Sequence, residues 1–130
     1  MRTYINGLLL SVLLAGNVSA QISLRELVGR WEMYEVYQGG KEVTHQYIPD
    51  AKRWIEFNSD YTFVSDGEPY GRKEGTFKLD EQTGLLSFDL NLGFGQRSFW
   101  QVEFEGRNMI WTDRGNPAID QIRVILVPDY

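Results

Sequence analysis

The feature that most constrains this chain is a series of short segments in which apolar and polar side chains alternate. Alternation with a period of two is typical of strands that bury one face and expose the other. Helical periodicity is almost absent after residue 29, and Gly, Asn, Asp and Pro separate the alternating segments. The sequence therefore predicts an all-β fold with eight strands, over residues 30–37, 53–58, 61–66, 73–79, 85–90, 97–105, 108–112 and 121–127.

The connections between these strands alternate in length. Along the chain they have 15, 2, 6, 5, 6, 2 and 8 residues. In an up-and-down arrangement, successive connections fall at opposite ends of the strands, so one end carries the longer loops and the other carries tight hairpins. Closure into a barrel removes exposed strand edges and leaves room for side chains or one small ligand. We therefore expect an eight-stranded antiparallel up-and-down barrel.

Six of the strands have apolar candidates for the barrel interior, whereas the first strand alternates poorly. Regular alternation would place Trp31, Met33 and Glu35 on one face of the strand, which would put a charged residue beside two apolar ones. This conflict predicts a β-bulge near Tyr34. The inward candidates of the other strands are Ile55, Phe57, Tyr61, Phe63, Phe77, Leu79, Leu86, Phe88, Leu90, Trp100, Val102, Phe104, Ile122, Val124 and Leu126.

A short helix is predicted before the first strand. Residues 23–26 read Ser-Leu-Arg-Glu, the pattern of a capping box in which the Ser23 and Glu26 side chains satisfy each other's backbone amides. Gly29 is a natural helix stop. Because the first strand starts at the end that carries the tight hairpins, the helix over 23–28 is expected to plug that end.

The N-terminal segment has the layout of a secretory signal peptide. Arg2 precedes a short apolar run, and the small residues Val18 and Ala20 come just before Gln21. The apolar run is well below the roughly 20 residues that a membrane-spanning helix needs, so no stable membrane insertion is expected. The sequence predicts a signal peptide over 1–20, cleaved after Ala20, and a secreted or periplasmic domain over 21–130.

Composition argues against several classes of protein. Thirteen basic and 18 acidic residues give a formal net charge of −5, which disfavours a nucleic-acid partner. The absence of cysteine excludes a disulfide scaffold and a thiolate zinc site. His45 is the one histidine, so neither a metal site nor a cofactor is expected. Scattered carboxylates and the lack of a nucleophile elbow predict no catalytic residues.

The helix followed by Gly29-Arg30-Trp31, the eight-strand meander and the long first loop together resemble the lipocalin family, in particular its short exported bacterial members. The resemblance covers residues 23–127 in layout. It implies that Trp31 seals the closed end of the barrel and that ligand enters between the longer loops. It also implies an arginine stacked on Trp31, and Arg107 lies at the correct end for that contact.

The longer loops supply the candidate ligand-binding residues. Aromatic rings with polar tips beside a guanidinium suit an amphipathic or anionic ligand. Phe94 stands out because the glycine-framed segment 92–95 places an apolar side chain on a loop tip with no obvious core partner. The candidates are Tyr47, Tyr70, Arg72, Phe94 and Arg114, and the structural candidates are Gly29, Trp31 and Arg107.

Three hypotheses for function follow. The first is an exported, non-enzymatic barrel that binds a small hydrophobic or amphipathic molecule at the long-loop end. The alternative is a periplasmic protein-binding module such as a protease-inhibitor barrel, although such inhibitors use an extended N-terminal arm and only Gln21 and Ile22 precede the helix here. A lipocalin-fold isomerase or haem protein is the third, with support from His45 alone.

Overall fold

The computed structural model describes residues 21–49, 52–67, 71–94, 98–114 and 120–129. The predicted signal peptide over 1–20 and the candidate Tyr70 lie outside these residues. Within them the chain forms two short helices and nine strands. These are α1 (Leu24–Leu27), β2 (Gly29–Gln38), β3 (Lys41–Glu42), α2 (Thr44–Tyr47), β4 (Trp54–Phe57), β5 (Thr62–Asp66), β6 (Lys73–Asp80), β7 (Leu85–Phe88), β8 (Phe99–Glu105), β9 (Asn108–Asp113) and β10 (Ile122–Pro128).

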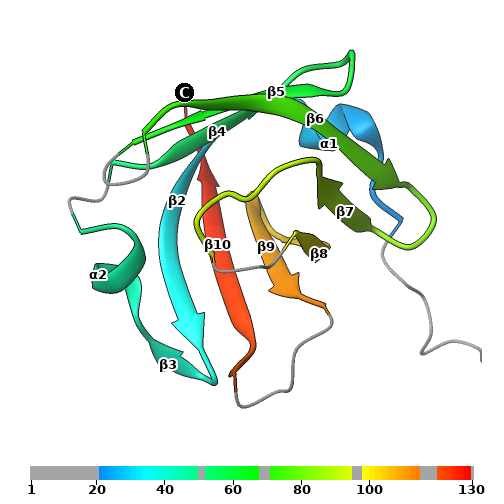
Figure 1. The fold of residues 1–130 in the computed structure, drawn as a ribbon. Helices are drawn as coiled ribbons and strands as arrows, with labels where there is room; N and C mark the ends of the chain where they lie inside the picture. Colours follow the sequence, from blue (N-terminus) through cyan, green and yellow to red (C-terminus); the bar gives the residue numbers. More distant parts are fainter. Residues whose placement is uncertain (1–20, 50–51, 68–70, 95–97, 115–119, 130) are drawn as a thin grey trace, which may run out of the picture.

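Eight strands close into an antiparallel barrel, as the sequence predicts. Strands β4 to β10 pair in chain order, β4 pairs with β2, and β10 returns to pair with β2. The short β3 forms a hairpin with β2, and α2 follows it, so the predicted 15-residue connection is partly structured. Figure 1 shows β3 and α2 beside β2, away from α1. Neither helix in the described ranges is long and apolar enough to span a membrane.

The first barrel strand contains the predicted bulge. Ile125 of β10 lies opposite Glu35 and Leu126 lies opposite Met33, so Tyr34 is the extra residue on β2. An extra residue shifts the alternation of a strand by one position. Trp31 and Met33 point into the core before the bulge, and Val36 is buried after it. The bulge therefore explains why β2 alternates poorly.

Aromatic rings fill the barrel interior. The ring centroids of Phe57 and Phe77 lie 5.0 Å apart, and those of Trp100 and Trp111 lie 5.5 Å apart. Most predicted inward residues are buried, but Tyr61 is not, and 44% of its surface is exposed. Tyr61 has φ of +68° in the turn before β5, which begins one residue later, so the strand alternation does not reach it.

The helix α1 plugs the predicted end of the barrel. Its capping box is present, with the Ser23 side chain accepting from the Glu26 backbone amide and the Glu26 carboxylate accepting from the Ser23 amide. Leu27 is fully buried, and the indole Nε1 of Trp31 donates to its carbonyl oxygen at 2.9 Å. Next, Gly29 opens β2 at φ of +127°, a conformation that favours glycine. The helix is thus fixed to the first barrel strand.

Candidate functional site

The barrel has two different ends. The short-turn end carries the β4–β5, β6–β7 and β8–β9 turns, together with α1, the start of β2 and the end of β10. The long-loop end carries the β2–β4, β5–β6, β7–β8 and β9–β10 connections. A candidate site is found at the short-turn end, opposite the end where the sequence places the ligand.

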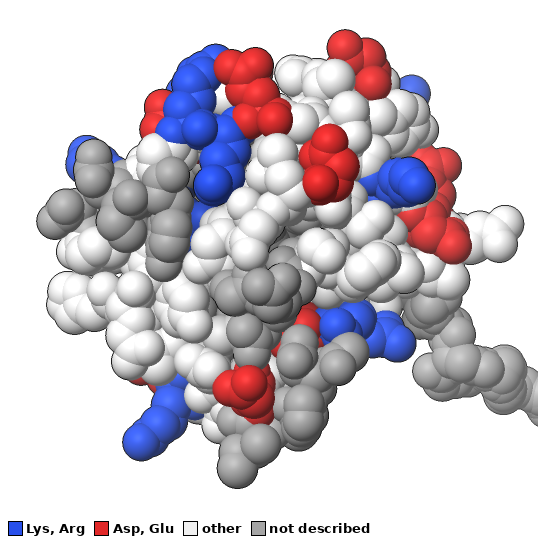
Figure 2. All heavy atoms as spheres, viewed as in Figure 1, with Lys and Arg blue, Asp and Glu red and all other residues white. Residues whose placement is uncertain are grey.

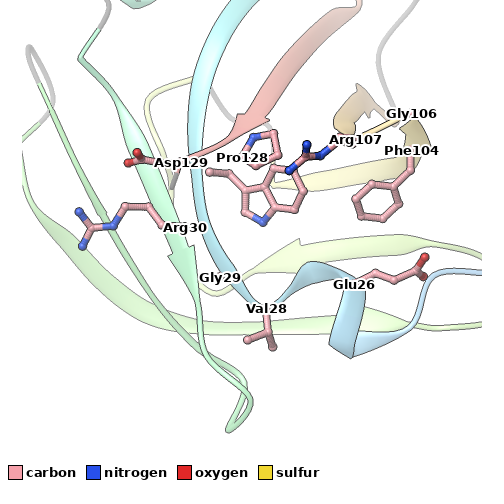
Figure 3. Close-up of a pocket in the computed structure, with 10 residues that line it drawn as sticks. Glu26, Val28, Gly29, Arg30, Phe104, Gly106, Arg107, Pro128 and Asp129 are labelled. Atoms are coloured by element: carbon pink, nitrogen blue, oxygen red, sulfur yellow. The ribbon is translucent and has the colours of Figure 1, made fainter.

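This candidate site is a hollow of about 520 Å³, called the short-turn hollow below (Figure 3). Three segments that are far apart in sequence bound it: the stretch from α1 into the start of β2, the β8–β9 turn and the end of β10. Its lining residues are Glu26, Val28, Gly29, Arg30, Trp31, Phe104, Gly106, Arg107, Pro128 and Asp129.

Aromatic and aliphatic groups form the base of the short-turn hollow. The ring centroids of Trp31 and Phe104 lie 5.9 Å apart with the rings tilted by 49°. Trp31 is only 7% exposed, and its one polar atom is bonded to the Leu27 carbonyl. Its surface toward the hollow is therefore carbon. Val28 is 39% exposed and adds a branched apolar wall without belonging to the core.

Charged groups of both signs surround this apolar base. The Glu26 carboxylate is held by the capping box. The Arg30 guanidinium forms an ion pair with Glu56 at 2.9 Å and lies 3.8 Å from the centroid of the Trp54 ring. In Figure 3, Arg30 and Asp129 lie on the side of the hollow away from Glu26 and Phe104. The hollow therefore combines an apolar floor with a rim that offers both donors and acceptors.

The long-loop end is closed over by its own aromatic side chains. Phe94 is fully buried, stacks on Tyr47 with ring centroids 5.3 Å apart, and meets Trp100 edge-on at 5.5 Å. The guanidinium of the buried Arg53 lies 4.7 Å from the Phe94 ring centroid and donates to the Leu92 carbonyl oxygen. The expectation that Phe94 serves no core is wrong, because the loop turns inward and covers the barrel.

Two other predicted binding residues at this end, Arg72 and Arg114, each bond to a side chain on the barrel surface. Arg72 is exposed and pairs with Glu74 at 2.9 Å. Arg114 is exposed and donates to Gln101 at 2.8 Å. Tyr70 lies outside the described residues. Of the five candidates, the structure brings Tyr47 and Phe94 together.

Some residues of the short-turn hollow were not anticipated as binding residues. Gly29, Trp31 and Arg107 were expected at this end as structural residues, and all three line the hollow. Val28 and Phe104 were not expected to line a site. The one local signal was the position of Val28, an apolar residue directly before the helix stop Gly29, and in the structure it belongs to neither α1 nor β2.

The described residues contain no group of three or more His, Cys, Asp or Glu side chains arranged to hold a metal ion. His45 lies exposed on α2 beside a separate hollow of about 430 Å³. On the face drawn in Figure 2, basic and acidic side chains are interspersed. This mixing gives no broad single-sign surface on that face.

Comparison with known proteins identifies a structural relative but no family. No family model matches the chain, and no curated protein matches it. A solved structure of a DUF4847 family protein from Bacteroides vulgatus ATCC 8482 is similar, with a TM-score of 0.56 and 13% sequence identity. The match covers 80% of this chain and 94% of the other. At this identity the likeness supports the barrel fold alone.

Proposed function

We propose that this chain is an exported, non-enzymatic barrel that binds a small hydrophobic or amphipathic molecule in the short-turn hollow. The observation that supports it is the apolar floor of Trp31 and Phe104 with the exposed wall of Val28. Ligand sites typically enclose about 300–1,000 Å³ and combine apolar walls with a few polar groups. The short-turn hollow, at about 520 Å³, has this size and composition.

The position of this proposed site differs from that implied by the lipocalin resemblance. Ligand access between the longer loops would have to displace Phe94 from its contacts with Tyr47 and Trp100. Burial of a large aromatic side chain stabilises a fold by about 2–3 kcal/mol, and displacement would forfeit that. The short-turn hollow needs no such displacement, because Val28 is already exposed to solvent.

Export forms part of the same proposal. The predicted cleavage after Ala20 would leave Gln21, Ile22 and Ser23 before α1. Ile22 is buried, and its amide donates to the Glu81 carbonyl oxygen at 3.1 Å. The intact mass of the exported protein is expected to correspond to residues 21–130. A mass that includes residues 1–20 would contradict export by this route.

The binding proposal is tested with the uncharged dye N-phenyl-1-naphthylamine, whose fluorescence rises in apolar surroundings. The wild-type protein is expected to bind it, and Val28→Asp is expected to weaken binding by about tenfold or more, because a carboxylate would then face the apolar floor. Phe99→Asp is the matched control, since Phe99 is 54% exposed at the long-loop end. It should leave dye binding unchanged.

Two outcomes would contradict the proposed function. Failure of the wild-type protein to bind the dye would favour the protein-binding alternative. Equal loss of binding in Val28→Asp and Phe99→Asp would mean that the dye does not report on the short-turn hollow.

A further inference from the structure

A second, polar hollow adjoins the short-turn hollow on the outside of the barrel. It has a volume of about 320 Å³, and we call it the outer hollow. Asp129 lines both hollows. Arg30, which lines the short-turn hollow, lies over the ring of Trp54, which lines the outer one. The lining residues of the outer hollow are Glu32, Lys52, Arg53, Trp54 and Asp129.

Strand pairing explains why these side chains meet. Glu32 of β2 is paired with Trp54 of β4 on one side and with Val127 of β10 on the other. Beyond β10, the Asp129 amide donates to the Arg30 carbonyl oxygen at 3.0 Å, which continues the ladder by one step. The two hollows therefore lie along one path around the end of β10, and Figure 3 shows Arg30 and Asp129 on that side.

Three of the four charged side chains that line the outer hollow are available to a ligand, and the fourth, Arg53, is buried and donates to the Leu92 carbonyl oxygen. Among the described residues, the side chains of Glu32, Lys52 and Asp129 form no hydrogen bond or ion pair with the protein. Glu32 and Asp129 supply acceptors, and Lys52 supplies donors. Hydroxyl groups both donate and accept, so several hydroxyls on one head group can satisfy all three side chains. A negatively charged head group would instead lie beside the carboxylates of Glu32 and Asp129, and a positively charged one would lie beside Lys52.

We propose that the ligand is an amphiphile with an uncharged, polyhydroxyl head group, such as an alkyl glycoside. Its apolar part occupies the short-turn hollow over Trp31 and Phe104, and its head group occupies the outer hollow between Lys52 and Asp129. The partly buried Trp54 supplies apolar surface for the C–H groups of a sugar ring. This inference rests on the proposed function, because it names the chemical class of the molecule bound at that site.

The test compares three amphiphiles that share a ten-carbon chain. Decyl maltoside, decanoate and decyltrimethylammonium, each below its critical micelle concentration, compete with N-phenyl-1-naphthylamine for the wild-type protein. We expect decyl maltoside to displace the dye at a concentration about tenfold lower than either charged amphiphile. Equal or better competition by a charged amphiphile would overturn the inference.

Variants of the outer hollow separate the head group from the apolar site. Lys52→Met and Glu32→Gln are each expected to weaken decyl maltoside binding by about fivefold or more while leaving dye binding unchanged, because both residues line the outer hollow and neither lines the short-turn hollow. Lys41→Met, on the exposed β3, is the matched control and should change neither. Unchanged maltoside binding in both outer-hollow variants would overturn the inference and leave the proposed function standing. Failure of the wild-type protein to bind the dye would overturn both.

Discussion

The two ends of this barrel differ in a way that loop length alone does not predict. The long-loop end has more residues available to form a binding surface, yet the side chains of Phe94, Leu92 and Tyr47 pack over the core there. At the other end the turns are short, and α1 closes the opening of the barrel instead. Leu27 and Ile22 plug it, but Val28 remains exposed beside Trp31. What decides access is therefore the direction of the apolar side chains.

The largest expected effect is loss of stability on truncation of Trp31. This side chain packs on Phe104 and fixes α1 through the Leu27 carbonyl oxygen. Trp31→Ala is expected to lower the free energy of unfolding by about 3–5 kcal/mol. Trp54→Ala, on the barrel exterior, should cost far less. Denaturant unfolding followed by circular dichroism measures both losses of stability. A near wild-type midpoint for Trp31→Ala would mean that Trp31 does not contribute to the core.

Phe94 tests the other end of the comparison. Because Phe94 is fully buried between Tyr47 and Trp100, Phe94→Ala is expected to cost about 3 kcal/mol or more of stability. Phe99→Ala is the control at the same end, and we expect a change within about 0.5 kcal/mol, as for an exposed site. Similar midpoints for the two variants would mean that Phe94 lies on an exposed loop tip, as the sequence suggests.

Local patterns in the sequence predict much of the fold. Period-two alternation predicts the eight barrel strands, the shared face of Glu35 predicts the bulge at Tyr34, and the pair Ser23 and Glu26 predicts α1. Each of these signals spans a few neighbouring residues. The pattern fails at Tyr61, where a left-handed turn residue precedes the strand.

The remaining features depend on contacts between distant residues. The helix α2 has no side-chain cap, and Thr44 instead accepts from the Val36 amide at 3.1 Å, a contact with β2. Burial of Phe94 requires Tyr47 and Trp100, which come from other parts of the chain. The short-turn hollow likewise exists only after three separate segments of the chain meet. No local pattern encodes such an arrangement.

The capping box gives a moderate effect at the short-turn end. Ser23→Ala removes the acceptor for the Glu26 amide and is expected to cost about 1 kcal/mol. Since α1 bounds the short-turn hollow, the dye should also bind more weakly. Ser59→Ala, in the exposed β4–β5 turn, is the control for stability. Unchanged stability and dye affinity in Ser23→Ala would show that α1 does not depend on this cap.

The smallest expected effect is a pH dependence in the β4–β5 turn. Hydrogen bonds from the Thr62 hydroxyl and amide hold the pKa of Asp60 below its ordinary value. A lowered pKa in the folded state adds stability above the unfolded pKa of about 4, and this is lost as pH falls through the folded pKa. The difference in unfolding midpoint between wild type and Asp60→Asn should shrink below about pH 4. A difference that is constant from pH 3 to 7 would contradict the lowered pKa.

The most direct test of the central claim is a titration of ¹⁵N-labelled protein with N-phenyl-1-naphthylamine, followed by two-dimensional ¹H–¹⁵N NMR. The account predicts that the amides of Val28, Gly29 and Gly106 and the indole N–H of Trp31 shift with the dye concentration, while the amides of Gly93 and Phe94 stay in place. Shifts confined to Gly93 and Phe94 would place the ligand at the long-loop end and contradict the account.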